Sequence, residues 1–182
     1  MPMPSKFSSS SPADLVARVR TGSPDALAEL YARYADALMA LAFRLTGTAS
    51  DAEDVLHDVF LGIPEALRRY DERGTLESWL KRVTARVALT LMRARSRARE
   101  VQLDAGPEPT DTRNADRLND LVAVGTAIDA LPEVLRTVFV LREVEGYSHA
   151  EIAALLDITT SASEVRLHRA LKALRRALIP TQ

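Results

Sequence analysis

Apolar residues recur three and four positions apart along almost the whole chain, and nowhere do they alternate as in a half-buried strand. A stripe of this kind is one side of a helix that must be buried against another helix. The clearest stripe comprises Leu27, Leu30, Tyr31, Tyr34, Leu38, Leu41 and Leu45. The pattern predicts an all-α fold.

A stretch almost without apolar residues interrupts this pattern. Residues 102–117 hold two Pro, one Gly and several acids, so they cannot bury enough surface to offset their ordering entropy. We therefore expect two small helical domains, residues 12–99 and 118–182, joined by a flexible acidic linker over 100–117. Residues 1–11, rich in Ser and Pro, are expected to form a flexible tail.

Cap and breaker residues divide the first domain into four helices. Gly22 and Gly47 end the first two helices. The last helix runs from Leu76 to about Arg99, and Pro64 is expected to kink the third helix or end it early. The expected N-terminal signals are Ser11 before Pro12, Ser23 before Pro24, and Ser50 as the cap of the third helix.

Basic residues gather in two places, although the formal net charge of the chain is only -1. Residues 68–99 carry ten Lys or Arg against three Asp or Glu, and residues 136–182 carry seven against five. A polyanion responds to a local basic stripe rather than to net charge. Each predicted domain therefore offers one candidate surface for nucleic acid.

Composition excludes several classes of protein. The chain has no Cys and three His, which removes disulfides, thiolate metal sites and cysteine nucleophiles and leaves little for a zinc site, so no cofactor is expected. No apolar run reaches the roughly 18 to 20 residues that cross a bilayer, and residues 1–11 lack the apolar stretch of a signal peptide. We expect a cytoplasmic protein without membrane insertion.

The second domain contains the pattern of a helix-turn-helix. Ser148 and Glu151 form a capping box before an apolar helix, and a basic amphipathic helix follows a short break that Thr159, Thr160 or Ser161 can cap. In such a unit the second helix enters the major groove. Base edges would then meet Ser161, Ser163, Glu164 and Arg166, and phosphates would meet His168, Arg169 and Lys172. An ordinary helical hairpin with a solvated basic face is the alternative.

Aromatic and basic residues also adjoin one another in the first domain. Tyr70 and Trp79 flank a polar loop beside cations, which is a composition that can hold unstacked single-stranded bases. Alternatively, Trp79 belongs to the core and Tyr70 anchors a helix end. The run RARSRAR at 93–99 adds cations that can contact phosphates of any sequence.

An acidic cluster lies at the start of the third predicted helix and contains Asp51, Glu53, Asp54 and Asp58. Glu53 and His57 are one turn apart, as metal ligands can be, but no matching Glu and His set appears on another helix. Favourable charge in the first helical turn together with a protein-docking face explains the cluster more simply.

Three motifs resemble those of bacterial RNA polymerase sigma factors of the extracytoplasmic-function type. Residues 51–61, DAEDVLHDVFL, are similar to DAEDLVQEVFL, and residues 73–83, RGTLESWLKRV, are similar to RGSFRAWLYRI. Residues 131–158, LPEVLRTVFVLREVEGYSHAEIAALLDI, are similar to LPxxxRxVFxLREVEGLSYxEIAxxLGI. The motifs occur in the family's order, so the chain is identified as a member of this family.

The resemblance implies a promoter-specificity factor without catalytic residues. Its partners would be core RNA polymerase, at the beta-prime clamp helices and the beta subunit, promoter DNA, and an inhibitory anti-sigma factor. The residues implied to bind polymerase are Asp51, Glu53, Asp54, Asp58, Val59 and Phe60. Those implied to bind the -10 element are Arg73, Gly74, Thr75, Trp79, Lys81, Arg82 and Arg86. Those implied to bind the -35 element are Ser163, Glu164, Arg166, Arg169 and Lys172.

The chain departs from the family pattern where DNA is read. Ala85-Arg86 replaces Arg-Asn, Asp157 replaces a Gly, and Ser161-Ala162-Ser163-Glu164 replaces Gly-Thr-Val-Lys. The departures at Ala85, Arg86, Ser163 and Glu164 support an alternative function, a sigma-like interaction protein that binds polymerase or a regulator with weakened promoter reading.

Overall fold

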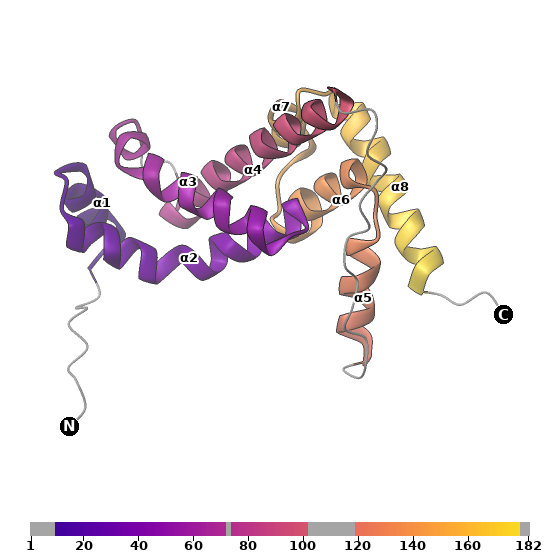
Figure 1. The fold of residues 1–182 in the computed structure, drawn as a ribbon, viewed down its shortest axis with the longest axis horizontal. Helices are drawn as coiled ribbons and strands as arrows, with labels where there is room; N and C mark the ends of the chain where they lie inside the picture. The colour runs from indigo at the N-terminus through magenta and orange to yellow at the C-terminus, as the bar shows by residue number, and fades with distance from the viewer. Residues whose placement is uncertain (1–9, 72–73, 102–118, 179–182) are drawn as a thin grey trace. The chain divides into compact units, whose positions relative to one another are not determined.

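The computed structural model describes residues 10–71, 74–101 and 119–178, and all regular structure in these ranges is helical (Figure 1). The chain divides into two compact units between Ala94 and Arg95. The predicted all-α fold in two helical domains is therefore confirmed. The predicted linker 100–117 and tail 1–11 lie almost entirely outside the described residues. None of the described helices is long and apolar enough to cross a membrane.

The first unit is built from four helices. They are α1 (Pro12–Arg20), α2 (Pro24–Thr46), α3 (Ala49–Arg68) and α4 (Leu76–Val101), of which the first unit contains the residues up to Ala94. Helix α2 packs along α3, and α1 contacts both. The largest fully buried side chains of this unit include Leu15, Leu30, Leu38, Leu41, Leu45, Ile63, Leu67 and Leu80. The predicted stripe of α2 thus supplies much of the core, which fixes the position of α3.

Capping residues explain where these helices begin. The Ser11 hydroxyl accepts from the Asp14 backbone N at 3.1 Å, and Ser23 caps α2 in the same way. The cap of α3 is Thr48, whose Oγ1 accepts from the Asp51 backbone N at 3.2 Å, so the prediction of Ser50 is wrong. Gly47 ends α2 in the left-handed conformation, which leaves Thr48 extended as a cap must be.

Pro64 lies inside α3 without ending it, so an early end at this residue is not observed. The helix continues to Arg68, and the neighbouring Ile63 and Leu67 are both fully buried. Burial of these two side chains offsets the backbone hydrogen bond that proline cannot donate. The residues of α3 before and after Pro64 therefore form one continuous helix.

The second unit is built around its last helix. Its elements are α5 (Asn119–Asp129), α6 (Glu133–Phe139), the π-helical turn η1 (Val140–Val144), α7 (His149–Leu156) and α8 (Thr160–Leu178). Helix α8 packs against α5, α6 and α7. One core cluster joins Leu131 to Ala170 and Leu174, with Ile128, Leu135 and Phe139 packed around it. The inner face of α8 is thereby fixed, and its outer face is left to solvent.

The helical stretch from Glu133 to Val144 changes its winding part-way. Beyond Phe139 it continues as a π turn, in which the Glu145 backbone N donates to the Val140 carbonyl at 3.0 Å. Val140 and Leu141 in this turn are fully buried. The wider turn keeps both side chains in the core, which periodicity along the sequence does not reveal.

Candidate functional site

One face of α3 combines acidic and apolar side chains. Glu53, Asp54 and Asp58 are exposed, as predicted for a docking surface. Asp51 and Val59, which were predicted to dock as well, are buried within the unit, with 4% and 1% of their surfaces exposed. Their side chains pack the helix in place and do not present a surface to a partner. We call Glu53, Asp54, His57, Asp58, Phe60 and Leu61 the docking face.

Two aromatic rings support the apolar edge of the docking face. The ring of Phe60 is half-buried against Tyr31 of α2, with ring centroids 4.8 Å apart. Leu61, beside Phe60, is 68% exposed, and Tyr31 is 50% exposed. Sequence reasoning missed Leu61 and Tyr31, because an apolar residue in a helical stripe is usually assigned to the core.

The docking face does not assemble a metal site. Within the ranges that the structure describes, no group of three or more His, Cys, Asp or Glu could hold an ion. Glu53 and His57 therefore have no third side-chain ligand of these types among the described residues.

The start of α4 is ordered by hydroxyl groups. Thr75 Oγ1 accepts from the Ser78 backbone N at 3.2 Å, and Ser78 Oγ donates to the Thr75 carbonyl at 2.9 Å. Gly74 adopts a φ of 93°, a conformation that L side chains rarely enter. The predicted -10 residues Gly74 and Thr75 thus shape the entry to the helix. Arg73 lies outside the described residues.

The two aromatics of this region are in contact. The rings of Tyr70 and Trp79 lie 5.0 Å apart at an interplanar angle of 58°. Tyr70 is buried, as the helix-anchor alternative expects, whereas Trp79 is only half-buried. Trp79 therefore keeps part of its ring surface available for stacking.

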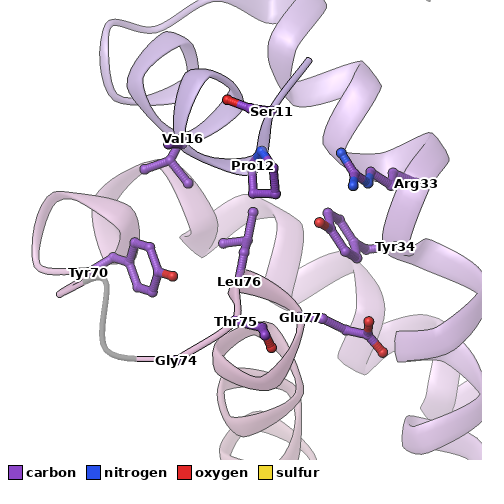
Figure 2. Close-up of a pocket in the computed structure, with 11 residues that line it drawn as sticks. Ser11, Pro12, Val16, Arg33, Tyr34, Tyr70, Gly74, Thr75, Leu76 and Glu77 are labelled. Atoms are coloured by element: carbon purple, nitrogen blue, oxygen red, sulfur yellow. The ribbon is translucent and has the colours of Figure 1, made fainter. Parts of the chain in front are cut away.

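A cavity of about 480 Å³ opens beside Tyr70. It lies between the start of α1, the middle of α2 and the start of α4 (Figure 2). Tyr34 and Tyr70 line it with their rings, Arg33 and Glu77 with their charges, and Leu76 with apolar surface. Its volume and mixed lining suit a flat aromatic group that carries polar edges.

Basic residues follow along α4. Arg82 and Arg86 are exposed, and Lys81 is half-buried beside Glu77, with 3.3 Å between the two charged groups. Ala85, at a departure from the family pattern, is fully buried. Ala85 therefore belongs to the interior, whereas Arg86 presents its charge at the surface.

The helix-turn-helix of the second unit has the predicted capping box. Ser148 Oγ accepts from the Glu151 backbone N at 3.2 Å, and Glu151 Oε2 accepts from the Ser148 backbone N at 2.9 Å. Of the three candidate caps for α8, Thr159 is the one that binds, and its Oγ1 accepts from the Ala162 backbone N at 3.1 Å. Asp157, between the two helices, has a left-handed φ of 54°.

The outer face of α8 is polar and basic. Its exposed side chains include Ser161, Glu164, His168, Arg169, Lys172, Arg175 and Arg176. Arg166 is half-buried, and Ser163 is fully buried. The predicted contact of Ser163 with DNA is therefore wrong for this conformation, because the Ser163 hydroxyl points inward and bonds His149 Nδ1 at 2.9 Å.

Comparison with known proteins identifies the family to which both units are similar. A family model described as Sigma-70 region 2 matches residues 30–98, and one described as Sigma-70, region 4 matches residues 121–174. The RNA polymerase sigma factor CarQ of Myxococcus xanthus is 32% identical over 166 residues, which cover 88% of this chain and 94% of CarQ. The chain belongs to the sigma-70 family.

Further relatives place it among extracytoplasmic-function sigma factors. The factor SigE of Mycolicibacterium smegmatis is 33% identical over 81% of this sigma factor, which spans 59% of the length of SigE. The structure of the sigma factor RpoE from Bartonella quintana, solved with the anti-sigma factor NepR, shares the fold at a TM-score of 0.63 and 22% identity. That likeness covers 85% of this chain and 97% of RpoE.

Proposed function

We propose that the two units of this promoter-specificity factor bind different partners. The first unit binds core RNA polymerase and captures the opened -10 strand, and the second holds the -35 duplex. The observation that carries this proposal is the order of the two family matches, one on each compact unit. The chain itself supplies binding energy and contributes no catalytic group, and with these partners it works in the cytoplasm.

Polymerase docking is assigned to the docking face of α3. Charged groups at the rim of an interface steer encounter and select the partner, whereas a central apolar anchor supplies most of the affinity. The acids Glu53, Asp54 and Asp58 suit the first role, and Phe60 with Leu61 suits the second. A partner surface with basic side chains around an apolar hollow would match this face.

Capture of the -10 strand is assigned to the cavity beside Tyr70 and to α4. A base released from the duplex offers a flat π surface and hydrogen-bonding edges. The cavity supplies rings from Tyr34 and Tyr70 and polar groups from Arg33 and Glu77. The exposed Arg82 and Arg86 then serve the phosphates of the same strand.

Holding of the -35 element is assigned to α8. Arg169 and Lys172, which are exposed, would meet phosphates, and Glu164, exposed in the first turns, would meet a base edge. A carboxylate can accept from the exocyclic amine of cytosine. Glu164 would therefore favour cytosine in the major groove, an unusual choice for a position that the family fills with Lys.

An anti-sigma factor is a further proposed partner. The Bartonella quintana factor that shares this fold was solved in complex with one. The exposed apolar side chains Leu61 and Val165, one on each unit, are candidate contacts, because an inhibitor must cover surfaces that polymerase or DNA would use.

Reconstituted transcription tests the proposed function. Purified chain is combined with core RNA polymerase and fragmented host genomic DNA, and the 5′ ends of transcripts are mapped. We expect start sites that share upstream -10 and -35 elements. A stable complex with polymerase that yields no transcripts would favour the alternative interaction protein, for which the acidic Glu164 on α8 is the supporting observation. No complex at all would refute the proposal.

A further inference from the structure

A buried hydrogen bond joins the two helices of the helix-turn-helix. Ser163 Oγ and His149 Nδ1 are 2.9 Å apart. The Ser163 side chain is fully buried, and His149 is half-buried. A hydroxyl can donate to or accept from an imidazole nitrogen, so the bond is available to either neutral tautomer of the ring. It satisfies a polar group that would otherwise be buried at a cost.

The bond acts at the opposite end of α7 from the turn. His149 is the first residue of α7, whereas Asp157 and the turn follow its last residue. Eight helical residues separate these points by about 12 Å. The first turn of α8 is therefore held near both ends of α7, by the covalent turn at one end and by Ser163 at the other.

The direction of Ser163 sets the rotation of α8 about its own axis. Ser163 and Lys172 are separated by about two and a half turns, which places them on opposite sides of the helix. With Ser163 turned toward His149, Lys172 faces outward, and the neighbouring Arg169 is exposed with it. A rotation of α8 by one residue, about 100°, would replace the side chains that face outward.

We infer that His149 and Ser163 form a positioning pair that sets the rotation of α8 and thereby selects which of its side chains face DNA. This inference rests on the proposed use of α8 as the DNA-reading helix. The imidazole of His149 supplies the hydrogen-bond partner that the buried hydroxyl of Ser163 requires.

The test is a double-mutant cycle with one conservative variant. Ser163→Ala and His149→Leu each remove the bond, and the double variant removes both partners. His149→Asn retains a polar atom near the place of Nδ1, and Ser50→Ala replaces an exposed serine in the first turn of α3 as a control. Each full-length variant is bound to core polymerase. The complex then selects from a library of duplexes in which about ten base pairs are randomised, a stretch longer than one helix contacts in the major groove.

We expect each bond-removing variant to lower affinity for the duplex that the wild type selects by about tenfold, the equivalent of one hydrogen bond. The double variant should lose no more than either single variant, because only one interaction is removed. The preferred bases should shift in all three. His149→Asn and Ser50→Ala should keep the wild-type preference and remain within about twofold of its affinity.

Thermal unfolding of the free chains separates a positioning role from a purely structural one. Variants that lose stability yet select the same bases as the wild type would overturn the inference, as would additive losses in the double variant. Failure of the proposed function looks different, because the wild-type complex itself would then select no sequence.

Discussion

Arg20 at the end of α1 holds the backbone of Tyr70 from across the first unit. Arg20 Nη2 donates to the Tyr70 carbonyl at 2.6 Å, and Arg20 Nε donates to the Leu67 carbonyl at 2.8 Å. Leu67 lies in the last turn of α3 and Tyr70 just beyond its end, so this guanidinium ties α1 to the end of α3 through two charge-assisted hydrogen bonds. Tyr70 in turn contacts Trp79 and lines the cavity. Through Arg20, α1 therefore helps to hold one wall of the cavity in place.

Arg20→Met is expected to destabilise the first unit by about 1 to 3 kcal/mol, because two carbonyls lose a charged donor. Arg20→Lys should recover only part of this loss, since an ammonium group cannot reproduce the planar fork. Urea unfolding measures both. Arg68→Gln is the control, because its pair with Glu65 is an exposed surface ion pair with 3.1 Å between the charged groups. An equal loss in the control would contradict the assignment to Arg20.

Glu29 should make stability depend on pH in the acid range. Burial raises the pKa of Glu29, but hydrogen bonds from Ser10 and Arg18 and the charge of Arg18 outweigh it and hold the pKa below its ordinary value. A carboxyl with a lowered pKa in the folded state stabilises above its unfolded pKa, and this contribution disappears as pH falls through the folded pKa.

Unfolding of the wild type and Glu29→Gln across about pH 3 to 6 checks this expectation. Glu29→Gln should lose less stability on acidification than the wild type does. Asp36→Asn, which removes an exposed acid from the same helix, should follow the wild type. Parallel curves for the wild type and Glu29→Gln would show that Glu29 is not the titrating group.

Asp157→Gly should stabilise the second unit. Asp157 holds a φ of 54° and a ψ of 50° after the last residue of α7. This conformation costs a residue with an L side chain about 1 to 2 kcal/mol. Glycine avoids that cost, but ordering its more flexible backbone costs about 0.5 to 1 kcal/mol. The expected gain is about 1 kcal/mol, measured by thermal unfolding. Asp157→Ala, which keeps the Cβ, should give no such gain.

Substitutions on the two units should separate polymerase binding from promoter binding. Asp54→Asn removes charge from the docking face and should weaken binding to core polymerase about threefold to tenfold, with no effect on binding of the -35 duplex. Arg169→Gln should weaken promoter binding by a similar factor and leave polymerase affinity unchanged. Fluorescence anisotropy with each partner measures both, and Asp25→Asn and Arg68→Gln serve as matched charge controls. Loss of both activities in either test variant would count against the assignment.

Lys172 should contribute to affinity without contributing to base choice. Each neutralised phosphate adds about 0.9 to the slope of log affinity against log salt concentration. Lys172→Ala should therefore reduce that slope by about 1 and weaken binding of all duplex sequences alike. A titration of the holoenzyme with a -35 duplex at several salt concentrations checks this. A change of preferred bases would place Lys172 at a base edge instead.

Local signals in the sequence predicted the helices and most of their ends. The pairs Ser11 with Pro12 and Ser148 with Glu151 satisfy backbone groups within one helical turn, so nearby residues suffice to recognise them. The cap of α3 was misplaced at Ser50, because two hydroxyl residues compete there and the conformation of Gly47 decides between them.

Which side chains lie at a surface was harder to predict. Glu53 and Asp54 are exposed as expected, but Asp51 of the same acidic cluster is buried. Side chains of an α-helix return to the same face every 3.6 positions, which is not a whole number. The sequence alone therefore locates the boundary between the buried and the exposed face only to within about one residue in each turn. Packing against α1 and α2 resolves that uncertainty for α3.

The sequence by itself determined the all-α fold, the division into two helical domains and the family, because periodicity, caps and motifs are properties of neighbouring residues. Only the tertiary structure decided that Leu61 is exposed, that Tyr70 lines a cavity and contacts Trp79, and that Ser163 faces His149 and not the solvent. These relationships join residues on different helices, and their energies depend on how the helices pack, which no local pattern along the chain encodes.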